Sequence, residues 1–225
     1  RYSIPVNRND EPYLLFAQNG SQWMNTGIDF SITRNNFHFF GEFAVDRNLS
    51  TAVLQGLMVS LDPRSDLAIV YRNINKAYQS PAGNSFTQLS RPGNEQGIYA
   101  SLFLRPKYGW RIDLSADIWK HTWLRYQVNA PSTNREMQVQ VVYTPSRNAE
   151  IYTRFRYSSR MKNELERSTA GIRSLGKMDA QQFRLQFSTK IDAALRIRTR
   201  LEWRKLGSGS TEQGFTLYTD LIYKP

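Results

Sequence analysis

The 225-residue chain carries 30 lysines and arginines against 19 acidic residues, a formal net charge of +11, and it contains no cysteine. The missing cysteines exclude a disulfide framework and a thiolate metal site, and no apolar run approaches the ~20 residues of a membrane-spanning helix. The surplus of positive charge indicates an anionic partner of one of three classes: nucleic acid, acidic lipid or an anionic solute.

Apolar and polar residues alternate along almost the whole chain after about 20 irregular residues. In "AALRIRTRLEWRK" (193–205), Ile197 and Trp203 share one parity with the leucines, while the arginines and Glu202 share the other. This period of two is typical of a strand with one apolar and one polar face. Similar segments occupy 25–34, 36–45, 51–62, 66–72, 97–105, 110–120, 137–144, 150–158, 182–190 and 214–223. The pattern predicts an all-β chain of about eleven or twelve strands, forming one domain over residues 1–225.

Short turns and longer polar links alternate between these segments. The short turns, at 33–36, 61–66, 105–109, 144–149 and 190–193, contain the Pro, Asn, Asp and Gly residues that favour tight reversals. The longer links are expected at 47–50, 75–96, 121–136, 159–178 and 206–211. Consecutive strands joined in this way form an antiparallel up-and-down meander, with all short turns at one end.

Alternation alone does not tell which face is the core, because a soluble barrel buries its apolar face and an outer-membrane barrel exposes it. Most segments run to ten or more residues, longer than the globular mode of ~5–6. At ~3.3 Å per residue and a tilt of ~45°, such strands span about 25 Å, the height of a membrane barrel's apolar band. Trp110, Tyr143 and Trp203 lie near strand ends, as the interfacial aromatics of such barrels do.

These features favour an antiparallel up-and-down transmembrane β-barrel in a bacterial outer membrane, in contact with membrane lipid. Bacterial single-chain barrels have even strand numbers, so a count of eleven favours a portion of a larger barrel. The polar parity then faces the lumen, and its arginines form a field that acts on anions. The arginines expected to do so are Arg111, Arg154, Arg156, Arg184, Arg196, Arg198 and Arg200.

The cation-lined lumen predicts passage or binding of anionic small solutes, or service as the barrel subunit of an envelope complex with partner subunits. Lumenal arginines paired structurally with Asp and Glu are an equally weighted interpretation. We expect no enzymatic activity, no catalytic residues, no cofactor and no metal. One alternative is a soluble basic β-barrel that binds nucleic acid or another polyanion, although arginines and aromatic residues fall mostly on opposite faces. A second is an outer-membrane hydrolase that uses the rim histidine His121, with Asp117 four residues before it on the same face.

The stretch "GIYASLFLRPKYGWRIDLSADIWKHTWLRYQVNAPSTNREMQVQVVYTPSRNAEIYTRFRY" (97–157) resembles the β-barrel portion of large outer-membrane proteins that carry N-terminal helix-hairpin-helix repeats similar to those of competence proteins. The similarity extends over 61–157, with the phrases "LDPR", "YRN" and "YQS". It implies a Gram-negative outer-membrane barrel and brings no catalytic motif. No helix-hairpin-helix segment occurs in this sequence, so the resemblance implies no handling of DNA.

Overall fold

The structure, a computed structural model, describes residues 6, 8–167, 173–192, 194–207 and 211–223. A short 3-10 helix, η1 (Pro12–Leu14), precedes eleven strands. The strands are β1 (Asn25–Arg34), β2 (Phe37–Asp46), β3 (Thr51–Asp62), β4 (Ser65–Ile74), β5 (Glu95–Leu104), β6 (Trp110–His121), β7 (Ser132–Ser146), β8 (Ala149–Arg167), β9 (Arg173–Lys190), β10 (Leu195–Gly207) and β11 (Thr211–Tyr223).

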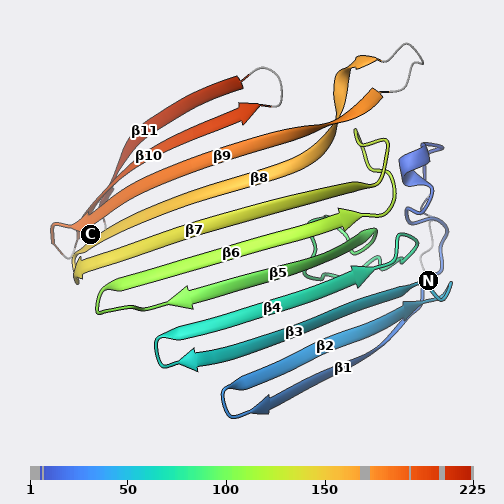
Figure 1. Cartoon of the computed structure of the whole chain (residues 1–225), viewed down its shortest axis with the longest axis horizontal. Coiled ribbons are helices and arrows are strands. Elements are labelled where there is room, and N and C mark those ends of the chain that lie inside the picture. Colours follow the sequence, from blue (N-terminus) through green and yellow to red (C-terminus); the bar gives the residue numbers. More distant parts are fainter. Residues whose placement is uncertain (1–5, 7, 168–172, 193, 208–210, 224–225) are drawn as a thin grey trace.

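All eleven strands form one antiparallel sheet in chain order, which confirms the predicted all-β, up-and-down organisation and strand number. Figure 1 shows a single twisted layer with β1 and β11 at opposite margins. Within the described residues this sheet is open, because β1 pairs only with β2 and β11 only with β10. Tight turns close one end of the hairpins; the turn between β1 and β2, for example, uses a positive φ of 53° at Asn35.

The extents of two predicted links are wrong. The sequence indicated links over 121–136 and 159–178, yet β7 begins at Ser132, β8 runs to Arg167 and β9 resumes at Arg173. The ends of β8 and β9 form a hairpin extension in which polar residues fall on both faces, for example Asn163 on the apolar parity and Lys162 on the polar one. Such a segment shows too little alternation for a periodicity argument to detect, although its backbone pairs with the neighbouring strand.

The strand register gathers the apolar parity into continuous rows across the sheet. One row contains a single apolar residue from each of β2 to β11: Phe37, Val59, Leu67, Leu102, Leu114, Val139, Phe155, Phe183, Trp203 and Phe215. We call the side that bears this row the apolar face. A shift of one residue along each strand moves to the other side, which we call the polar face.

The connection between β4 and β5 covers part of the polar face. From the connection between β4 and β5 (residues 75–94), Gln88 Nε2 donates to Asp117 Oδ2 at 2.8 Å and Thr87 Oγ1 donates to Glu95 Oε2 at 2.8 Å, so this loop lies on the polar face. On the apolar face, Ile98 and Ile118 pair in mid-sheet and are 53% and 52% exposed.

The apolar cluster of fully buried residues is small among the described parts of the chain. It consists of Ala44 and Ile74 from the sheet together with Tyr78 from the 75–94 loop, and Ala52 packs against it. No helix in the described ranges is long and apolar enough to cross a membrane. The sheet therefore has the opposite arrangement from a protein with a dry core, since charges lie inside and hydrophobic side chains outside.

Candidate functional site

The structure places all seven arginines singled out in the sequence on the polar face. Six of them, Arg154, Arg156, Arg184, Arg196, Arg198 and Arg200, lie on the neighbouring strands β8, β9 and β10 and are half-buried. Arg111 lies apart from them on β6, exposed, with its Nε 3.6 Å from Asp113 Oδ2. The register therefore separates one compact group from a single distant residue.

Three of these arginines have polar partners on adjacent strands. Arg156 donates from Nη2 to Glu136 Oε2 on β7 at 2.6 Å, and Arg184 Nε lies 2.7 Å from Glu202 Oε1 on β10. Arg200 donates from Nε and Nη2 to Gln186 Oε1, at 2.9 and 2.7 Å. These contacts match the structural interpretation, in which cross-strand pairs fill the interior.

The other three arginines of the compact group on β8–β10 are not neutralised in this way. Arg154, Arg196 and Arg198 form no ion pair with any residue in the described part of the chain. Arg154 lies directly opposite another arginine, Arg184, and Arg198 lies opposite Asp220 without an ion pair. The Nε atoms of Arg154 and Arg198 are buried and lack a hydrogen-bond partner. Positive charge on this surface therefore exceeds what the neighbouring carboxylates balance.

The charges of the polar face divide between its two halves. On β1–β6, which we call the acidic wall, Arg72 and Arg111 face the more numerous carboxylates Asp29, Glu42, Asp46, Asp66, Glu95, Asp113 and Asp117. On β8–β11, which we call the basic wall, the carboxylates among the described side chains are Glu150, Glu164, Glu202, Glu212 and Asp220. They are outnumbered by Arg154, Arg156, Arg160, Lys162, Arg184, Lys190, Arg196, Arg198, Arg200 and Arg204. Sequence parity alone missed this division, because it needs the order of the strands.

The acidic wall contains a buried ionic cluster centred on Arg72, whose side chain has no exposed surface. Its Nε donates to Glu95 Oε1, and its Nη2 donates to Asp117 Oδ1 at 3.0 Å. Gln88 from the 75–94 loop contacts both carboxylates, through its backbone N–H to Glu95 and its side chain to Asp117. The cluster therefore holds the loop against the polar face of β4–β6.

His121 belongs to this buried region and not to an exposed rim. Trp119 Nε1 can only donate, and it donates to His121 Nε2 at 3.0 Å. His121 is therefore neutral with its proton on Nδ1, which lies 2.8 Å from the carbonyl oxygen of Asn94. Asp117 is bonded to Arg72 and Gln88. The His121–Asp117 pair of the hydrolase alternative is thus not formed, and the imidazole, with no exposed surface, is closed to a substrate.

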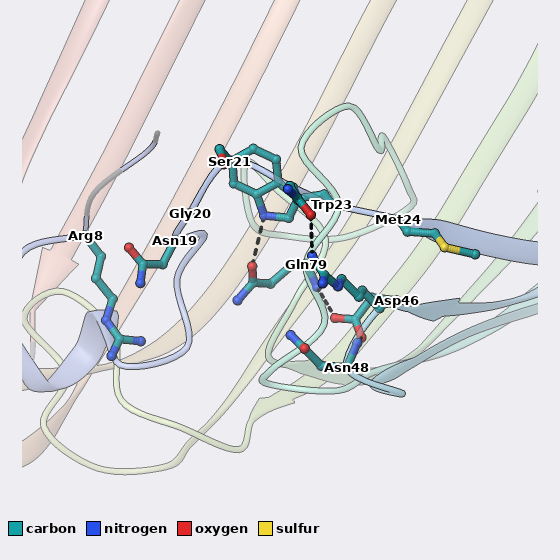
Figure 2. A pocket seen from close by; sticks show the side chains of 11 residues that line it. Arg8, Asn19, Gly20, Ser21, Trp23, Met24, Asp46, Asn48 and Gln79 are labelled. Atoms are coloured by element: carbon teal, nitrogen blue, oxygen red, sulfur yellow. Dashed lines mark hydrogen bonds between the residues drawn. The ribbon is translucent and has the colours of Figure 1, made fainter. Parts of the chain in front are cut away.

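The N-terminal segment lies over the same end of the sheet as the longer loops. Figure 2 shows that Trp23 Nε1 donates to Gln79 Oε1 at 3.1 Å and that the backbone N–H of Gln79 donates to Asp46 Oδ2 at 3.0 Å. These residues border a polar pocket of about 530 Å³. In the β6–β7 loop nearby, burial, and then the charge of Arg160, lower the pKa of Arg125. Trp123 of that loop donates from Nε1 to the carbonyl oxygen of Pro12 at 3.1 Å, so the N-terminal segment and the loops form one cap.

The three expected interfacial aromatics lie on the apolar face. Trp110 and Tyr143 pair in register beside the short turns and stack with ring centroids 4.5 Å apart. Trp203 lies towards the other end, between Phe183 and Phe215 in the long apolar row. The next row towards the loops contains Gln181, Lys205 and Gln213. Trp203 therefore marks the place where the apolar face gives way to polar side chains.

Among solved structures, the chain is similar to the NanC porin in its rhombohedral crystal form. The sequence identity is 13%, the TM-score is 0.38, and the match covers 90% of this chain and 94% of that chain. No protein-family model matches the chain, and no curated protein is significantly similar to it in sequence. The resemblance to barrels that accompany helix-hairpin-helix repeats stays a prediction.

Proposed function

We propose that this chain forms the wall of an outer-membrane β-barrel that passes or binds anionic solutes along its basic wall. The observation that carries the proposal is the inversion of the two faces. Mid-sheet isoleucines such as Ile98 and Ile118 are half-exposed, whereas Arg72 and its carboxylate partners are buried. In water a continuous apolar surface of this extent is unfavourable by ~25 cal/mol per Å² and is rare on monomeric soluble proteins. Lipid removes that cost.

The anionic specificity follows from the distribution of charge on the polar face. The 75–94 loop contacts Glu95 and Asp117 and thereby covers part of the acidic wall. Arg154, Arg196 and Arg198 on the basic wall have no carboxylate partner among the described residues. Rings and rows of guanidinium groups concentrate anions in pores, since arginine keeps its charge at any relevant pH.

The soluble alternative is less well supported. A nucleic-acid platform combines stacking aromatics and cations on one surface. Here Phe155, Phe183 and Trp203 lie on the opposite face from the arginines. The role as barrel subunit of an envelope complex stays a prediction from the sequence.

The test is a measurement of ion selectivity in planar bilayers, on protein that shows a heat-modifiable band in detergent. We expect anion selectivity in the native protein and a shift towards cations in R154Q/R184Q. The matched control is R135Q, which removes the same kind of charge from the apolar face of β7. A water-soluble protein without heat modifiability, or equal selectivity in the native protein and R154Q/R184Q, contradicts the proposal.

A further inference from the structure

A polar cavity of about 280 Å³ lies at the short-turn end of the basic wall. Its lining includes Arg147 from the β7–β8 turn, Lys190 from β9, and Arg196 and Arg198 from β10. Glu150 is the carboxylate among its lining residues. Four cations against one carboxylate leave the cavity with a strong positive surplus.

The cations converge because three strand ends and a turn meet there. The backbone N–H of Lys190 donates to the carbonyl oxygen of Asn148 at 2.7 Å, which fixes the β7–β8 turn, and Arg147 with it, against the end of β9. Arg196 lies directly opposite Lys190 in register. These like charges are adjacent on the polar face, an arrangement that is unfavourable unless an anion neutralises it.

The neutral groups of the cavity are oriented to donate. Gln186 Oε1 accepts from Arg200, so its amide nitrogen points towards Ser188, and Nε2 lies 3.4 Å from Ser188 Oγ. The Ser188 oxygen therefore acts as the acceptor in that contact, which leaves its hydroxyl proton free to donate. Ser188 pairs directly with Arg198, whose Nε is buried without a partner.

From these observations we propose a discrete binding site for a dianionic oxyanion, a phosphate or phosphate monoester group, at this end of the basic wall. This inference rests on the proposed function, because the site would bind anions at one position along the basic wall over which the pore passes them. Two guanidinium forks provide bidentate hydrogen bonds, Lys190 and Arg147 add charge, and Ser188 adds a neutral donor. A monoanion such as chloride has neither the charge nor the geometry to satisfy this set.

The test titrates inorganic phosphate into the protein in a phosphate-free non-ionic detergent and follows the ³¹P NMR signal. We expect a saturable change in the native protein and binding weaker by about tenfold or more in R196Q/R198Q. The double variant R135Q/K205Q, which removes two charges from the apolar face, should bind as the native protein does. All variants are first required to show the heat-modifiable band.

The outcomes separate the site from the pore. Equal phosphate binding in the native protein and R196Q/R198Q, or an equal loss in the single variant R156Q far along the wall, overturns the site even if the bilayer shows anion selectivity. Phosphate binding that is lost in R196Q/R198Q supports the site even if no anion selectivity is found, in which case the pore proposal alone fails.

Discussion

Arg154 and Arg184 lie directly opposite each other on β8 and β9, and within the described residues only Arg184 has a carboxylate partner, Glu202 on β10 at 2.7 Å. Like charges in direct register are unfavourable in a sheet. The same carboxylate, Glu202, also lies 3.7 Å from Arg200 Nη1. A single carboxylate thus moderates a group of three guanidinium ions.

Removal of that carboxylate should strengthen anion selectivity. In E202Q one negative charge disappears from the basic wall. A unit charge about 7 Å from a permeating ion in water changes its energy by ~0.6 kcal/mol, close to RT. Because the anion gains this energy and the cation loses it, we expect the anion-to-cation permeability ratio to rise up to about sevenfold, measured from reversal potentials in a salt gradient. Thr153→Ser, on the apolar face of β8, is the control and should leave the ratio unchanged. A fall in the ratio for E202Q contradicts a lumenal position for this wall.

The orientation of the sheet can be tested on two adjacent residues of β7. Val139 belongs to the long apolar row, and Gln138 lies on the polar face next to it. If the apolar face meets lipid, Val139→Arg should destabilise the folded barrel by about 2–4 kcal/mol in the bilayer midplane, whereas Gln138→Arg should have a small effect. Unfolding in urea from lipid vesicles measures both. If the two variants lose the same free energy of unfolding, or if Gln138→Arg loses more, the apolar face is not the face that meets lipid.

The stacked pair at the short-turn end gives a further test. Trp110 and Tyr143 have ring planes inclined by 28° with centroids 4.5 Å apart. A double-mutant cycle with Trp110→Ala and Tyr143→Ala should return a coupling energy of about 0.5–1.5 kcal/mol beyond the separate losses of area. The control pair is Trp110 with Trp203, which lies elsewhere on the apolar face and should show additive effects. Additivity within the Trp110–Tyr143 pair would show that the stack contributes nothing in the membrane.

Much of this fold is readable from the sequence because period two is visible wherever one face is apolar. Strands such as β6 and β10 satisfy that condition, and their predicted limits agree with the structure to within a few residues. The extended hairpin of β8 and β9 satisfies it poorly, because polar residues such as Asn163 and Lys177 interrupt its apolar parity. There only backbone pairing reveals the strand.

The site was less readable, because parity assigns a face but not a neighbour. Arg72 shares the polar parity, but the sequence could not show that Glu95 and Asp117 both pair with its buried guanidinium group. Glu95 fell within a segment expected to be a link, so its place in β5 was hidden. The separation of acidic and basic walls, likewise, emerges only when strand order and register are known.

The buried cluster of Arg72 yields the last prediction. Replacement of Arg72 by Ala leaves Glu95 and Asp117 buried without their cation, and such a loss costs about 3–5 kcal/mol. We therefore expect the temperature at which the compact band disappears on heating to fall strongly. The matched control is Arg111→Ala, whose exposed pair with Asp113 spans 3.6 Å and is worth at most about 1 kcal/mol. The triple variant R72M/E95Q/D117N removes all three charges and should recover much of the loss. If R72A is no less stable than R111A, the carboxylates are solvated and the loop over β4–β6 is not held by this cluster.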